Sequence, residues 1–306
     1  MKKFFNFCMA IFVLCAVIFP AKTFAADDPN SEGIKAFREA LTADATESKD
    51  NIFRQDIFFA SPLVQGALEV LGMIENDAFK STGEFSLWIN NDDGTVTDKT
   101  IPFYMTQIGK DMTIYFKADK KWEKFTTPTL AAGIMDMVAT PTDAEIEEII
   151  ADTKEVTILQ ENENRRIMLI KIDGDRMADS FKAKVEENPD PNSNPVQEAA
   201  INYFDTAFRN ADMWYMWTID KRDWHTIAMQ YQFSGFIQEL ARAILNDPNQ
   251  QLPDEINQLL ETVAYYSEIR AYTTYLTDPA AKKVFEIPKN VLKAKEVDSL
   301  VPAATK

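Results

Sequence analysis

Hydrophobic residues recur along this chain with two different periods. Ile34, Phe37 and Leu41 stand three and four residues apart, and this spacing predicts an amphipathic helix over about residues 32–46. From about residue 52 to residue 127 the period shortens to two, which is typical of strands with one buried face. The pattern therefore predicts one helix followed by an antiparallel series of strands joined by polar turns.

Helical and strand periods continue to alternate after this series. The Asn- and Pro-rich residues 188–195 favour a surface loop, with a domain boundary as the alternative. The spacing indicates an α+β fold built on an antiparallel sheet. Helices are predicted at about 142–153, 176–187, 196–209, 236–246 and 253–262. Strands are predicted at about 156–160, 166–172, 213–220, 225–233 and 264–276, with a closing strand at Phe285-Glu286-Ile287-Pro288 and a short helix from Asn290.

The first 25 residues have the pattern of a secretory signal peptide. Two lysines precede an apolar run over residues 4–19, and Thr23-Phe24-Ala25-Ala26 offers a small-residue cleavage site after Ala25 or, as second choice, after Ala26. An uncleaved membrane anchor is the alternative, although the run is shorter than the ~20 residues that span a bilayer. No later segment approaches such a run, so we expect a soluble mature protein without a transmembrane segment.

Cleavage changes the chemistry that is available to the mature chain. It removes both cysteines, three lysines and no acid, so the formal charge of −16 becomes −19. Disulfides then contribute nothing, and residues 26–306 must be held together by a hydrophobic core. We expect the acidic surface to keep the protein soluble in the periplasm or the extracellular space.

Composition argues against a nucleic-acid partner and against most enzymes. Acidic residues number 48 against 32 basic ones, whereas phosphate recognition depends on clustered basic side chains. The chain has a single histidine, His225, which begins a predicted strand, and the pattern favours a hydrogen bond from it to the preceding turn. Gly94 and Gly174 lie in acidic turns, but neither turn has the ligand spacing of an EF-hand. We therefore expect no catalytic residue, no metal and no cofactor.

The most informative pattern is a strand with large apolar side chains on both faces. Trp214 and Met216 lie on one face of the predicted strand 213–220, and a second apolar set lies on the other. Such a strand suits either a cavity for flexible apolar ligands or an ordinary two-layer core with some aromatic residues at the surface. The candidate cavity residues on this strand and the next are Met213, Tyr215, Trp217, Ile227, Met229, Tyr231 and Phe233.

The order of a helix, a long antiparallel meander, interposed helices and an Ile-Pro ending resembles the LolA/LppX superfamily of exported lipid and lipoprotein carriers. The branch of larger exported members is the most similar. The resemblance implies a strongly curved, unclosed half-barrel whose concave face is covered by helices over an apolar pocket for acyl chains. It also implies one domain over residues 26–306, with 236–262 as a candidate helical lid. The residues on which the resemblance rests are Ile34, Phe37, Leu41 and the segments 112–116, 122–125 and 284–294.

These observations predict an exported, non-catalytic carrier or binding protein for an amphiphilic lipid or acyl chain, with a lipoprotein as a further candidate cargo. An envelope protein-interaction or sensor module with the same fold and a filled cavity is the alternative. An acid-dependent hydrolase is a third hypothesis, because acidic side chains are abundant.

Overall fold

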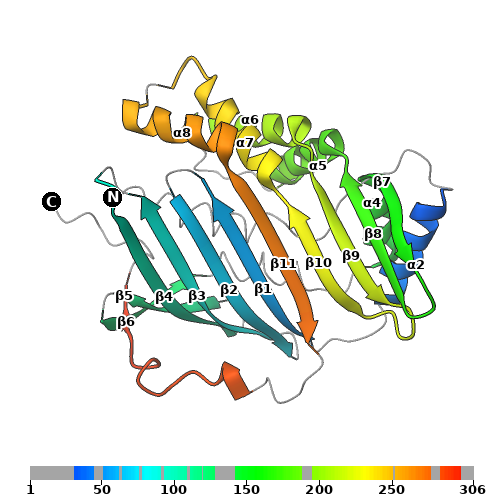
Figure 1. Ribbon diagram of the computed structural model, residues 1–306, viewed down its shortest axis with the longest axis horizontal. Helices are drawn as coiled ribbons and strands as arrows, with labels where there is room; N and C mark the ends of the chain where they lie inside the picture. The colour runs from blue at the N-terminus through cyan, green and yellow to red at the C-terminus, as the bar shows by residue number, and fades with distance from the viewer. Residues whose placement is uncertain are drawn as a thin grey trace.

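The computed structural model describes residues 31–44, 51–61, 64–75, 78–90, 93–108, 111–118, 120–127, 142–187, 195–250, 252–276 and 283–297. The expected signal peptide and residues 188–194 of the expected loop lie outside these ranges. The described chain forms an α+β fold around one unclosed sheet of twelve strands (Figure 1). The strand order is β12-β6-β5-β4-β3-β2-β1-β11-β10-β9-β8-β7, and every pairing is antiparallel except β12 with β6.

The strands confirm the predicted alternation of periods. In the first half of the chain they are β1 Asn51–Ala60, β2 Val64–Glu75, β3 Ala78–Asn90, β4 Val96–Ile108, β5 Asp111–Ala118 and β6 Lys121–Thr127. In the second half they are β7 Thr153–Glu161, β8 Arg165–Ile172, β9 Trp214–Asp220, β10 Thr226–Gln232, β11 Glu268–Leu276 and β12 Lys295–Glu296.

The described residues form six α-helices, which lie in two groups. In Figure 1, α5 to α8 run along the upper ends of the strands, and α2 and α4 lie beside β7 and β8. None of the described helices combines the length and the apolar composition that crossing a membrane requires. The helices are α2 Glu32–Asp44, α4 Asp143–Ala151, α5 Gly174–Glu187, α6 Pro195–Asn210, α7 Ser234–Leu245 and α8 Asp254–Tyr266.

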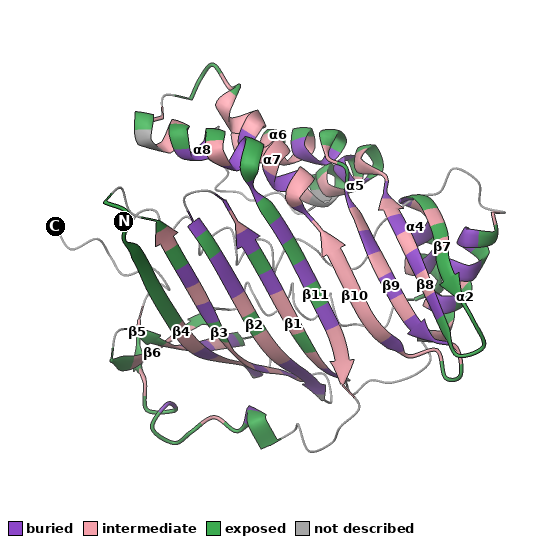
Figure 2. Ribbon diagram, viewed as in Figure 1, coloured by how far each residue is buried: buried purple, intermediate pink, exposed green. Residues whose placement is uncertain are grey.

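The two faces of the sheet differ in burial. We call the face that carries Ile57 and Trp217 the inner face, and the face that carries Phe58 and Tyr272 the outer face. Buried residues recur at every second position over much of β11 and over parts of β1 and β3 in Figure 2, as a period of two requires. Strand register places one row of apolar side chains across the inner face: Phe85, Leu68, Ile57, Ala271, Tyr231, Tyr215 and Ile170.

Two glycines let phenylalanine rings lie against the inner face of the sheet. A Cβ atom at Gly72 would collide with the Phe53 ring, and one at Gly83 would lie 2.9 Å from Cζ of Phe103. A glycine inside a strand marks such a close approach. The rings therefore cover backbone that has no side chain of its own.

The ends of the sheet are protected by other parts of the chain. At the β7 edge, a Cβ atom at Gly33 would collide with the carbonyl oxygen of Val156, so α2 packs directly on the strand backbone. At the opposite edge, β12 pairs with β6, and the Val297 N–H donates to the Lys124 carbonyl at 2.9 Å. These contacts cover each edge only in part, because β12 pairs with two residues of β6 and α2 approaches the β7 backbone at Val156.

Three predictions near the C-terminus are wrong. Residues 264–266 continue α8 rather than starting β11. Phe285 ends a single 3₁₀ turn and packs against Ile52 and Met73, so it does not belong to a closing strand. The chain after Asn290 forms hydrogen-bonded turns instead of a helix, because the bonds from Val291 and Leu292 return only to the Pro288 carbonyl.

Candidate functional site

The structure gathers most of the predicted cavity residues on the inner face of β9 and β10. Register pairs Tyr231 with Tyr215 and Met229 with Trp217. Ile227 departs from this pattern, because it is the extra residue of a β-bulge between Thr226 and Ala228. Met213, Tyr215, Trp217 and Phe233 are at most 5% exposed, whereas Ile227, Met229 and Tyr231 are half-buried.

Aromatic contacts and hydrogen bonds fix these side chains in place. The Tyr231 ring lies 5.6 Å from that of Tyr215 and 5.5 Å from that of Phe233. The indole N–H of Trp217 donates to Thr226 Oγ1 at 3.0 Å, and its ring meets Phe37 of α2 edge-on at 5.8 Å. Burial raises the pKa of both the Tyr215 and the Tyr231 hydroxyl. This part of the inner face is therefore a packed aromatic core.

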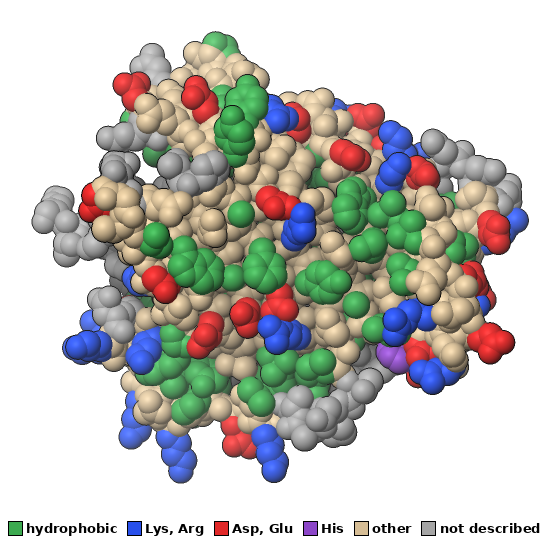
Figure 3. Space-filling model, viewed as in Figure 1, with side chains coloured by type: hydrophobic (Ala, Val, Ile, Leu, Met, Phe, Trp, Pro, Cys, Tyr) green, Lys and Arg blue, Asp and Glu red, His purple; other side chains and the backbone are tan. Residues whose placement is uncertain are grey.

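The outer face of the sheet also carries large apolar side chains. Trp214 and Met216 lie there and are half-buried, as expected for a strand with two apolar faces. Phe58, Trp88 and Tyr272 are 52%, 37% and 46% exposed. A band of hydrophobic side chains crosses the middle of the face seen in Figure 3, above a row of acidic ones.

The inner face of β2, β3 and β4 carries apolar side chains that are less completely covered. Leu68, Ile89 and Ile101 are half-buried, although each packs against the core. The described helices meet the sheet most extensively at β7, through α2, and at β11, through α7. We call Leu68, Ile89 and Ile101 the inner apolar surface.

Sequence reasoning did not include the inner apolar surface in the candidate site. The sequence shows the alternation through Phe85, Leu87 and Ile89. Alternation indicates which face of a sheet a side chain lies on, but it does not indicate whether a helix covers that face. The interior glycines of β2 and β3 were the only local sign of an unusual inner face here.

One buried cation joins α2 to the sheet. Arg166 on β8 is 8% exposed, and its guanidinium donates to Glu39 of α2 at 3.0 Å and to Glu161 at 2.9 Å. It also lies 5.5 Å from the centre of the Trp224 ring. Hydrogen bonds from Arg166 and Lys221 lower the pKa of Glu161 to about 2. These contacts assign Arg166 a structural role.

The single histidine lies in the turn before β10. Nδ1 of His225 is 2.6 Å from Oδ1 of Asp223, which confirms the predicted hydrogen bond to the turn. Asp220 completes a group whose potential metal-ligating atoms lie within 4.8 Å of one another. Arg222 already binds both carboxylate oxygens of Asp220 and lowers the pKa of that carboxyl. The hydrogen bonds of the turn therefore account for this grouping.

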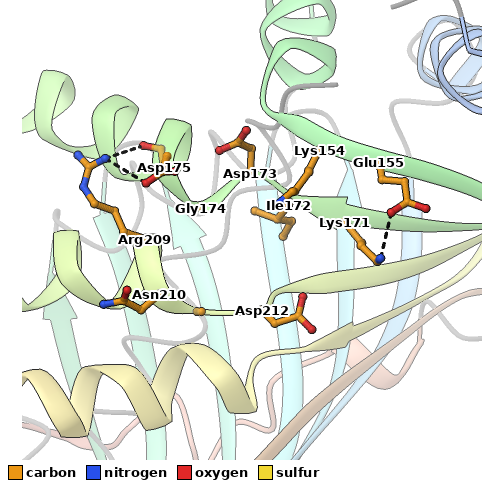
Figure 4. A pocket seen from close by; sticks show the side chains of 11 residues that line it. Lys154, Glu155, Lys171, Ile172, Asp173, Gly174, Asp175, Arg209, Asn210 and Asp212 are labelled. Carbon is orange, nitrogen blue, oxygen red and sulfur yellow. Dashed lines mark hydrogen bonds and ion pairs between the residues drawn. The ribbon is translucent and has the colours of Figure 1, made fainter. Parts of the chain in front are cut away.

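A polar hollow of about 380 Å³ lies where α5 begins, between β8 and the end of α6 (Figure 4). Its charges largely neutralise one another: Lys171 pairs with Glu155 at 2.9 Å, and Arg209 pairs with Asp175 at 3.4 Å. Gly174 permits the turn to pass close to the carbonyl oxygen of Phe208. The hollow therefore shows no preference for a cationic or an anionic ligand.

Comparison with known proteins gives no assignment. The chain matches no protein-family model, and no curated protein matches it.

Proposed function

We propose that the protein is an exported, non-catalytic carrier or binding protein for an amphiphilic lipid or acyl chain. The proposal includes a strongly curved, unclosed half-barrel with helices over its concave face and α7 and α8 as a lid. The half-buried inner apolar surface carries this proposal. A sheet whose inner side chains were fully covered by helices would offer no apolar area to a ligand.

The chemistry of the inner apolar surface suits an acyl chain. Leu68, Ile89 and Ile101 present hydrocarbon on three neighbouring strands, and Ile101 pairs with Phe85 across β3 and β4. An acyl chain lying on these side chains would remove the rest of their surface from water, at roughly 25 cal/mol per Å².

Titration of a fluorescent fatty acid into the mature chain tests this function. We expect saturable uptake, and we expect Leu68→Gln and Ile101→Gln to weaken it about tenfold, because each places an amide against the acyl chain. Met216→Gln is the matched control, since it makes a similar change at a half-buried position on the outer face. Thermal unfolding of each variant separates loss of binding from loss of the fold.

Equal weakening by all three variants, or uptake that does not saturate, would contradict an inner binding surface. The alternative function, a protein-interaction or sensor module with a filled core, predicts no uptake at all. It also predicts that cross-linking in the cell envelope captures one protein partner whose yield is insensitive to added lipid.

A further inference from the structure

Two segments of this acidic chain are strongly basic. Residues 109–127 and 281–297 together contain ten lysines, no arginine and five acids, a formal charge of +5 within a chain of −16. More than 150 residues of sequence separate the two segments. The net charge of the whole chain is negative and therefore does not reveal them.

The fold brings these two segments together. β12 pairs with β6, and Lys124 bonds Glu296 at 3.0 Å across this pairing. The buried side chains of Phe285 and Val291, at 5% and 1% exposure, anchor the C-terminal segment to the body of the protein. We call the described lysines of both segments the lysine-rich edge: Lys117, Lys120, Lys121, Lys124, Lys283, Lys289, Lys293 and Lys295.

The lysine-rich edge presents its charges to solvent. All of its lysines except Lys124 are exposed, and blue side chains project along the lower left border of the molecule in Figure 3. Exposed apolar side chains accompany them, because Val284 and Leu292 are each 51% exposed. Half-buried Trp122 lies nearby on β6, and its ring centre is 5.6 Å from that of Tyr104, with the two rings tilted against each other.

We propose that the lysine-rich edge docks on an anionic lipid surface. Lysine acts as a compact, flexible point charge, whereas arginine provides the planar fork that recognises a single phosphate or carboxylate. A patch made of lysine alone therefore suits a surface with many mobile anionic headgroups. Val284 and Leu292 fit the same partner, since a bilayer offers hydrocarbon directly beneath its headgroups.

The acidic charge of the whole molecule does not prevent this contact. Charges beyond a Debye length of about 8 Å at physiological salt are largely screened. An approaching membrane therefore responds to the edge that faces it and much less to the distant acidic surface. Docking by this edge also orients the protein, because the oppositely charged faces turn away from the membrane.

Co-sedimentation of the mature chain with lipid vesicles tests the docking surface. We expect binding to vesicles of phosphatidylcholine mixed with phosphatidylglycerol, weaker binding as salt rises, and little binding to phosphatidylcholine alone. The triple variant Lys283→Glu, Lys289→Glu, Lys293→Glu should bind the mixed vesicles on the order of 100-fold more weakly. Leu292→Ser should weaken binding less and without changing its salt dependence.

The matched control is Lys35→Glu, Lys154→Glu, Lys182→Glu, which makes the same change in net charge at exposed sites on α2, β7 and α5. The control should bind nearly as well as the parent chain. Equal losses in the two triple variants would overturn the proposal, because net charge alone would then govern binding. Equal binding to neutral vesicles, or stronger binding to a soluble acidic polypeptide than to vesicles, would also overturn it. Vesicle binding needs no cargo, so it can succeed even if fatty-acid uptake fails.

Discussion

Single side chains show how this fold manages buried polar groups. Asp152 ends α4, is 4% exposed, and accepts a hydrogen bond from Ser180 of α5 at 3.3 Å. Burial raises the pKa of its carboxyl to about 6. The hydrogen bond from Ser180 and the positive charge of Arg176 lower this pKa, but by less than burial raises it. The ionised form is therefore less stable in the folded protein than in water.

The pKa of Asp152 sets the sign of a pH effect on stability. Between about pH 4 and pH 6 the folded state holds a proton that the unfolded state has released, so this group makes the free energy of unfolding fall as pH rises. Above about pH 7 the loss is complete, and Asp152→Asn should then raise that free energy by about 3 kcal/mol. Urea unfolding at pH 4 and pH 8 measures both values.

A D152N variant that loses stability equally at both pH values would contradict this assignment. Such a result would mean that the carboxylate makes a favourable contact in its ionised form. Ser180→Ala serves as a comparison, because it removes the hydrogen bond to Asp152 and leaves the titrating group in place.

At the level of elements, local sequence signals explain where helices begin. Thr142 and Glu145 form a capping box at the start of α4: the Glu145 N–H donates to Thr142 Oγ1 at 3.3 Å, and the Thr142 N–H donates to Glu145 Oε2 at 2.7 Å. Ile146, Ile149 and Ile150 then form the buried side of the helix. The cap and the apolar stripe together specify α4.

Removal of this cap should lower the free energy of unfolding. Thr142→Ala is expected to lower the free energy of unfolding by about 1 kcal/mol, because the Glu145 N–H at the helix start loses its acceptor, Thr142 Oγ1. Thr206→Ala is the control within α6, where the Thr206 hydroxyl bonds only the Asn202 carbonyl one turn earlier. Chemical unfolding of both variants measures the difference, and an equal effect in the two would contradict the capping role.

Much of the element order could be predicted from sequence, because helix and strand periods differ. The pattern through Phe85, Leu87 and Ile89 identified β3, and Gly94, at a φ of +80°, marked the turn after it. The boundary between α8 and β11 was misplaced, since an apolar run such as Val263-Ala264-Tyr265-Tyr266 fits either period.

Pairing between distant strands could not be predicted in the same way. β1 lies beside β11, which is more than 200 residues later, and β6 lies beside β12. Local patterning carries no information on such partners. It therefore revealed the aromatic residues around Trp217 but neither the inner apolar surface nor the lysine-rich edge.

Across the whole molecule, the inner apolar surface and the lysine-rich edge consist of different residues, as the proposed lipid carrier requires. The inner apolar surface would hold the cargo, and the lysine-rich edge would bring the protein to a membrane. In this proposal, the remaining acidic surface would keep the carrier in solution between these encounters. The two roles use different residues, so they can be altered independently.

The proposed carrier function requires that the protein bind an amphiphilic lipid. Residues 26–306 can be purified and extracted with organic solvent, and lipid mass spectrometry of the extract tests this requirement. We expect one class of amphiphile in an amount comparable to the protein, with less in the Leu68→Gln and Ile101→Gln variants. An extract without lipid, from a protein that also takes up no fluorescent fatty acid, would contradict the proposed carrier function.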